Sequence, residues 1–222
     1  MKKILDKVKG NIKTNKNMLI FLSIIGIFGV IIGTILNIAL NSDDSKLVSE
    51  FLDNFIYNIQ NNNLDYKGSF FNSLISNLGY VVFIWLLGIS VIGLPITIFI
   101  FFTKTFVLGF SITSIIANYK LKGCLLALSY IFPHMIINIF VYIILTMYSL
   151  SLSLKMFQTI VKKQTLDFKF IMHKYLKILL ISIAIIVITS AIEVFFTPNL
   201  MKIVISILKW LTNINLMLYT RH

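Results

Sequence analysis

The chain has 222 residues, of which 58% are hydrophobic and 13% are charged, and its mean hydropathy is +0.91. Soluble domains usually carry about a quarter charged residues, so this composition excludes a disordered chain and an ordinary soluble enzyme and indicates a multi-pass membrane protein. The formal net charge is +12, and lysine supplies all but one of the 20 basic residues. Because these lysines flank apolar runs, we expect them to hold helix ends at a cytoplasmic membrane surface, and we expect no nucleic-acid partner.

A basic tail, residues 1–17, precedes the first apolar run, residues 18–40. As a helix this run would be roughly 35 Å long, enough to cross a hydrocarbon core of about 30 Å. It is too long for the apolar segment of a cleaved signal peptide, so we expect a first transmembrane helix with its amino end in the cytoplasm. Gly29 and Gly33, together with Gly26, place small residues near one face, which favours close contact with another helix.

The segment 41–73 differs in character, because residues 41–68 hold five of the eight acidic residues of the chain. Apolar residues between Leu47 and Ile59 recur three and four positions apart, which predicts an amphipathic helix. An acidic segment across the membrane from a lysine-rich tail agrees with the charge asymmetry of membrane proteins. We therefore expect this helix on the extracytoplasmic side.

The next stretch, residues 70–118, carries Lys104 as its only charge and is too long for one span. The sequence Gly-Leu-Pro ending at Pro95 supplies the interruption, because proline cannot donate a backbone hydrogen bond and disfavours helix at the residue before it. We predict a second span at 74–92 and a third at 96–116, followed by a turn.

The fourth apolar stretch, residues 124–154, would be roughly 46 Å long as a helix, so it must tilt or bend, and Pro133 is the expected bend. A second basic segment, 155–177, is expected in the cytoplasm, and a fifth span at 178–196 is expected to stop at the Thr-Pro-Asn that begins at residue 197. Two lysines in the tail, residues 199–222, favour an amphipathic helix on the membrane surface, with a sixth span as the alternative.

These predictions give an all-α, polytopic membrane bundle formed by residues 1–222 as a single domain, with about five transmembrane helices and amphipathic surface helices. The lipid bilayer is its first expected partner, and the sequence leaves open whether the chain forms a homo-oligomer. Residues expected to shape helix packing are Gly26, Gly29, Gly33, Gly88, Gly93, Pro95, Gly109 and Pro133.

The sequence contains no glycine-rich phosphate loop, no nucleophile elbow and no zinc-ligand spacing, so we expect neither an enzyme nor a cofactor or metal site. Three ionisable residues, Lys104, His134 and Glu193, fall in or near apolar spans, and such residues are functional candidates because they are costly in lipid. Each also has a structural alternative. Lys104 can extend to the membrane surface, His134 can bind a carbonyl freed by the bend, and Glu193 can pair with His134 or a helix end.

The segment 85–96 reads WLLGISVIGLPI and resembles the signature of the stage II sporulation protein M family. The segment 106–110, FVLGF, is similar to that family's third span. Pro133 with His134, and Glu193 near the end of the fifth span, also fall at matching places, and the resemblance extends over most of the chain.

The resemblance implies a multi-pass membrane protein of the mother cell of endospore-forming bacteria. Proteins of this family recruit two wall-degrading partners, stage II sporulation proteins D and P, to the septum during engulfment, and act as scaffolds that are not themselves hydrolases. We therefore expect a scaffold in the cell membrane that localises these partners.

The amphipathic helix is the expected docking site, and its face is hypothesised to comprise Phe51, Leu52, Phe55 and Ile56, with Asp44, Glu50 and Asp53 at the rim. The alternative is that this stripe lies on the bilayer or covers the protein's own outer ends. Two other functions remain open: a small permease or channel that uses Lys104, His134 and Glu193, and an envelope scaffold in a cell that does not sporulate.

Overall fold

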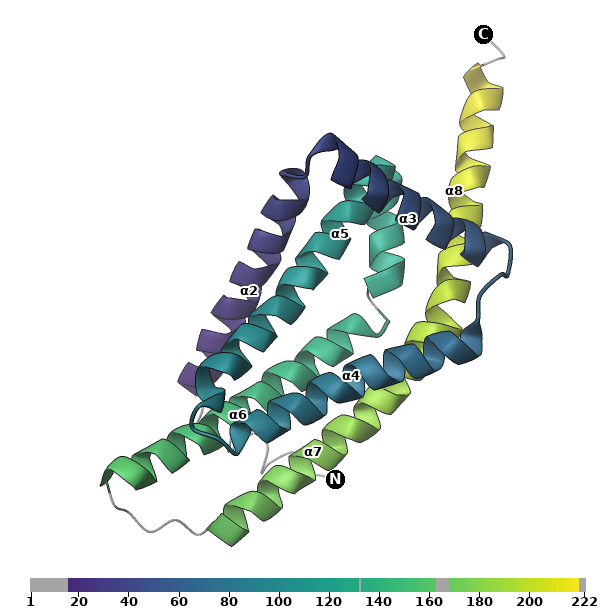
Figure 1. Ribbon diagram of the computed structural model, residues 1–222. Coiled ribbons are helices and arrows are strands. Elements are labelled where there is room, and N and C mark those ends of the chain that lie inside the picture. Colours follow the sequence, from purple (N-terminus) through teal and green to yellow (C-terminus); the bar gives the residue numbers. More distant parts are fainter. Residues whose placement is uncertain (1–15, 132, 163–167, 220–222) are drawn as a thin grey trace.

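A computed structural model describes residues 16–131, 133–162 and 168–219, with residue 162 and residues 209–219 as backbone only. The predicted basic tail, residues 1–17, therefore lies almost wholly outside the described residues, as do part of the basic segment 155–177 and the end of the tail 199–222. Over the described ranges the regular structure is entirely helical, which confirms the all-α prediction (Figure 1).

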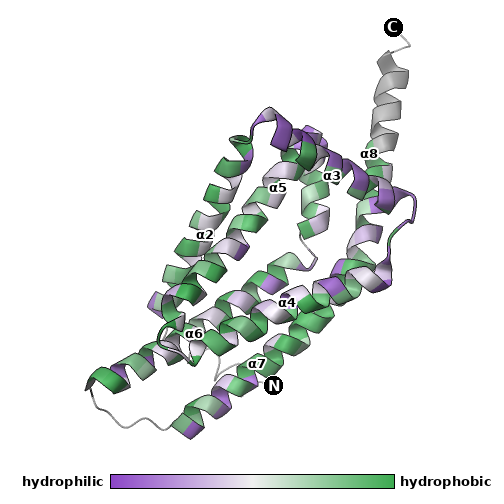
Figure 2. Ribbon diagram, in the orientation of Figure 1, coloured by the Kyte–Doolittle hydropathy of each residue, from purple (hydrophilic) through white to green (hydrophobic). Residues whose placement is uncertain are grey.

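Five segments are long and apolar enough to cross a membrane, and the chain is a multi-pass membrane protein. Large apolar side chains such as Ile24 and Phe99, which are 60% and 67% exposed, cover the outside of these helices, as expected for surfaces in contact with lipid. Figure 2 shows the contrast between these apolar helices and the hydrophilic α3. In chain order the elements are α2 (Lys16–Ile38), α3 (Ser42–Gln60), α4 (Tyr66–Gly88), α5 (Gly93–Ile131), α6 (Met135–Lys162), α7 (Phe168–Ala191), the π-helical turn η1 (Ile192–Phe196) and α8 (Thr197–Tyr219).

Local sequence explains where α3 and α4 begin. The Asn41 side chain accepts a hydrogen bond from the backbone N–H of Asp44 at 2.8 Å, and Asp65 does the same for Gly68 at 3.0 Å. Both are N-caps that satisfy amide groups without a partner inside the helix. Asp43 and Asp44 lie in the first turn of α3, where carboxylates interact favourably with the helix dipole.

The most extensive contact between helices joins α2 and α5, which lie side by side in Figure 1. A Cβ atom on Gly29 would lie 3.0 Å from the carbonyl oxygen of Phe102, and one on Gly33 would collide with that of Phe106. On the facing helix, a Cβ on Gly109 would lie 2.7 Å from the Cα of Val30. The absence of these side chains lets the two backbones touch, which is how small residues join helices in lipid.

The other residues that were expected to shape helix packing differ in how closely a neighbour approaches them. A Cβ on Gly88 would collide with the hydroxyl of Tyr175, and one on Gly93 would collide with the carbonyl of Leu87, so both sites require glycine. Gly26 is less constrained, since a Cβ there would make an ordinary 3.5 Å contact with Phe101. Pro95 lies in the first turn of α5, where a missing N–H costs little.

The turn predicted after the third span is confirmed. Lys120 (φ 52°, ψ −132°), inside the element labelled α5, breaks the helix and reverses the chain. The segment that follows folds back, so that a Cβ on Gly123 would lie 2.8 Å from the Cα of Ile116. The predicted single bent helix over 124–154 is wrong, because α5 ends at Ile131 and α6 begins at Met135, with Pro133 between them.

The fifth apolar segment does not stop at residues 197–199 as predicted. It continues from α7 through η1 directly into α8. Pro198 lacks an N–H and its ring crowds the carbonyl of Val194, which favours the wider π turn over a helix end. Residues 199–219 of the predicted tail thus continue the helix of the fifth apolar segment.

Candidate functional site

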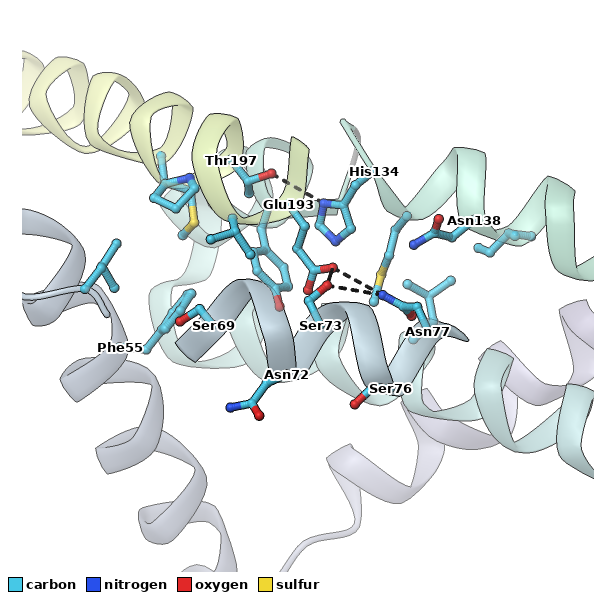
Figure 3. A pocket seen from close by; sticks show the side chains of 18 of the residues that line it. Phe55, Ser69, Asn72, Ser73, Ser76, Asn77, His134, Asn138, Glu193 and Thr197 are labelled. Carbon is cyan, nitrogen blue, oxygen red and sulfur yellow. Dashed lines mark hydrogen bonds between the residues drawn. The ribbon is translucent and has the colours of Figure 1, made fainter. Parts of the chain in front are cut away.

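A cavity of about 450 Å³ lies where the two interruptions, the α5–α6 break and η1, face each other across the bundle (Figure 3). It is bounded by α4, α5, α6, η1 and α8, with Phe55 of α3 and Leu64 of the α3–α4 connection also in its wall. Its lining includes Lys104, His134 and Glu193, which the sequence marked separately as intramembrane candidates. The polar lining residues are Ser69, Asn72, Ser73, Ser76, Asn77, Lys104, His134, Asn138, Glu193 and Thr197.

The carboxylate of Glu193 is held by α4. The hydroxyl of Ser73 donates a hydrogen bond to Glu193 Oε2 at 2.6 Å, and Asn77 Nδ2 approaches the same oxygen at 3.5 Å. The amide oxygen of Asn77 accepts a hydrogen bond from the Tyr142 hydroxyl at 2.8 Å. This network joins α4, α6 and η1, and it fixes the carboxylate at the cavity wall as Figure 3 shows.

His134 is 1% exposed, and its Nδ1 lies 3.4 Å from the hydroxyl oxygen of Thr197. The Thr197 hydroxyl also lies 3.2 Å from the carbonyl of Ile192, and when it donates its single proton there, His134 Nδ1–H is the donor to Thr197. The other ring nitrogen, Nε2, then keeps a free lone pair, and it points toward the cavity in Figure 3. The partner of His134 is therefore a side chain of α8 and not the freed carbonyl considered from the sequence.

The ammonium group of Lys104 lies over two tyrosine rings, 5.2 Å from the ring centroid of Tyr80 and 5.6 Å from that of Tyr142. No ion pair within 4.0 Å involves Lys104 among the residues that the structure describes. The aromatic faces stabilise the cation by its attraction to their quadrupoles. Lys104 thus neither extends to the membrane surface nor pairs with Glu193, although both line one cavity.

Asn77 and Tyr142, which are 8% and 2% exposed, give a direct test of the network. Asn77→Ala would leave the buried Tyr142 hydroxyl without its acceptor, and we expect a loss of about 1–3 kcal/mol in the free energy of unfolding in detergent micelles. In a Tyr142→Phe background the same change should cost clearly less, because no hydroxyl is left unpaired. Asn72→Ala, on an exposed position of the same helix, is the control, and equal costs in both backgrounds would contradict the network.

The predicted docking face on α3 is only partly free. Leu52, Phe55 and Ile56 pack against the protein's own core, and Phe55 lies edge-on to Tyr130 with ring centroids 5.8 Å apart. The hypothesis that these three form an open face with Phe51 is therefore wrong, because α3 lies across the ends of α5 and α8. Phe51 is 71% exposed and remains available.

The acidic rim residues lie on exposed positions of α3. Asp44 and Glu50 are exposed, and the Asp53 carboxylate accepts a hydrogen bond from the Tyr119 hydroxyl at 2.5 Å. Asp53 therefore helps to fix α3 on α5. Leu47, 65% exposed and one helical turn before Phe51, extends the free apolar surface and was absent from the predicted face.

The sequence analysis missed Thr197, Tyr130 and Tyr142 as cavity residues. One local signal was present, since Thr197 follows Glu193 by four positions and precedes a proline. In the described part of the chain, no three His, Cys, Asp or Glu side chains are grouped as they would be to hold a metal ion.

Comparison with known families gives one result. The model of the family described as stage II sporulation protein M matches residues 18–198, which include nearly all of α2, the elements α3 to η1 and the polar lining of the cavity. No curated protein and no solved structure matches the chain.

Proposed function

Because the chain belongs to the stage II sporulation protein M family and is thus a sporulation-associated membrane protein, we propose that it is the scaffold that localises wall-degrading partners at the septum during engulfment. The expected partners are stage II sporulation proteins D and P. In this proposal the amino terminus is cytoplasmic, and α3 faces the wall compartment where those partners act.

The observation that carries this proposal is the free surface of α3. Leu47 and Phe51 are 65% and 71% exposed, and the carboxylates of Asp44 and Glu50 lie on exposed positions of the same helix. The opposite side of α3 is already fixed to the bundle, so its free surface is preorganised for a partner. An apolar pair beside carboxylates suits a basic, amphipathic segment of a partner close to the membrane.

We expect Phe51→Asp combined with Leu47→Asp to reduce co-purification of the partners by about tenfold or more, since buried aromatic anchors dominate such interfaces. The measurement is recovery of proteins D and P with the tagged chain from sporulating cells. The control is Leu121→Asp, which introduces the same charge at a side chain that is 88% exposed on the α5 reversal.

Unchanged recovery with the double variant would reject the docking surface on α3. A null mutant tests the larger proposal, because it should stop before engulfment and retain thick septal wall. Normal engulfment in the null mutant would reject the scaffold function itself.

A second candidate, a small permease or channel, is favoured by the cavity that collects Lys104, His134 and Glu193. Interrupted helices that face a polar cavity form the substrate sites of many transporters. Substrate flux into proteoliposomes that is lost in Glu193→Gln would support this candidate over the scaffold.

A further inference from the structure

The cavity holds one cationic side chain, Lys104, and one anionic side chain, Glu193, which form no ion pair within 4.0 Å. From this arrangement we infer that it binds a zwitterionic group, which places an ammonium at Glu193 and a carboxylate or phosphate at Lys104. This binding site goes beyond the scaffold function, and its test uses the purified chain without wall-degrading partners.

The positive end of the site is Lys104. Its ammonium has two tyrosine rings as neighbours and no carboxylate within ion-pair distance among the described side chains. The tyrosine rings do not accept hydrogen bonds from all the N–H groups of Lys104, so these remain available to an anionic oxygen. In a site of low dielectric constant an ammonium group binds such an oxygen strongly.

The negative end is Glu193. Its Oε2 atom accepts from Ser73, whereas its Oε1 atom has no hydrogen-bond donor among the described residues. The Nε2 atom of His134 faces the cavity, and it adds an acceptor in the tautomer whose proton is on Nδ1, beside Thr197. The Tyr130 ring also lines this part of the wall. An ammonium has three donors and a positive charge, and these acceptors and the aromatic ring match both properties.

Charge balance selects a zwitterion over a simple ion. The lining carries one lysine and one glutamate, so an anion alone would leave Glu193 uncompensated and a cation alone would leave Lys104 uncompensated. Uncompensated charge is expensive in a site surrounded by lipid-embedded helices. A volume of about 450 Å³ lies within the usual range of small-ligand sites.

Two sources supply this chemistry: the headgroup of phosphatidylethanolamine and a free amino acid. For the lipid source, the protein is purified from bilayers of equal phosphatidylethanolamine and phosphatidylglycerol, and the retained lipid is measured by mass spectrometry. For the soluble source, L-alanine is titrated calorimetrically into the protein in phosphatidylglycerol nanodiscs. Ethanolamine and propionate, which each carry one of the two charges, are titrated in parallel.

We expect either retention of phosphatidylethanolamine about tenfold above phosphatidylglycerol, or binding of L-alanine at least about tenfold tighter than ethanolamine and propionate. The first result assigns the lipid source, and the second assigns the soluble source. If the protein shows no enrichment of phosphatidylethanolamine and no selective binding of L-alanine, the inference is overturned. This comparison needs no variant.

Variants locate the site. Lys104→Met and Glu193→Gln should each weaken the selective binding by at least about tenfold, since each removes one charged partner of the zwitterion. Lys46→Met and Asp43→Asn, which make the same kinds of change at exposed positions of α3, should leave it unaltered. Circular dichroism checks that all variants remain helical, and equal binding by folded Lys104→Met and wild type would overturn the assignment.

Discussion

Gly109→Ala is expected to lower the free energy of unfolding by about 2–3 kcal/mol, even though alanine is the better helix former. The added methyl group would collide with the carbonyl oxygen of Val30 and would lie 2.7 Å from its Cα atom. Backbone atoms cannot rotate out of the way as a side chain can, so α2 and α5 must separate and lose the contacts along their length.

Denaturation with sodium dodecyl sulfate in mixed micelles, followed by circular dichroism, measures this effect. The matched control is Gly79→Ala in α4, because a Cβ there meets no atom within 4 Å. It should be neutral or stabilise the protein by up to about 1 kcal/mol. Equal stabilities of the two variants would show that the α2–α5 contact is looser than described.

Deletion of Phe196 is expected to have the second large effect. A π turn holds one residue more than an α turn, so removing one residue from η1 allows a regular helix and turns α8 by about 100° relative to α7. Met201 and Ile205, now 2% and 8% exposed, would leave the core, and each buried apolar side chain contributes about 1.5–3 kcal/mol. Thr197 would also move away from His134.

Limited proteolysis and micelle denaturation measure the loss of α8 packing. Phe196→Ala is the control, because it keeps the residue count and the π turn and shortens a side chain that is 54% exposed. We expect the deletion to expose α8 to protease while the substitution changes little. A deletion variant as stable as Phe196→Ala would contradict the packing role of η1.

The sequence predicted the apolar helices and their interruptions because these depend on local chemistry. A backbone in lipid must satisfy its hydrogen bonds within each helix, so the number of long apolar segments follows from composition. Pro133 interrupts regular helix wherever the rest of the chain lies, since it has no N–H. The same local rule failed at Pro198, where the backbone adopted a π turn and the helix continued.

Helix partners could not be read from the sequence. Gly29 and Gly33 indicated close packing, but only the structure identifies α5, through Gly109, as the neighbour. In lipid no hydrophobic force selects one apolar surface over another, so the choice depends on shape and hydrogen bonds over many residues. For the same reason the sequence left open whether Leu52, Phe55 and Ile56 form an open face or cover the protein's own outer ends, and the structure packs them, half-buried, against the bundle.

By itself, the sequence determined that this chain lives in a membrane, that it has five long apolar helical segments, and that Lys104, His134 and Glu193 are costly exceptions among them. Only the tertiary structure brought those three side chains to one cavity and left Lys104 and Glu193 unpaired. The physical reason is that composition and helical periodicity act over a few turns. Lys104 and Glu193 are about 90 positions apart in the chain. They line one cavity because of how two interrupted helices pack against their neighbours.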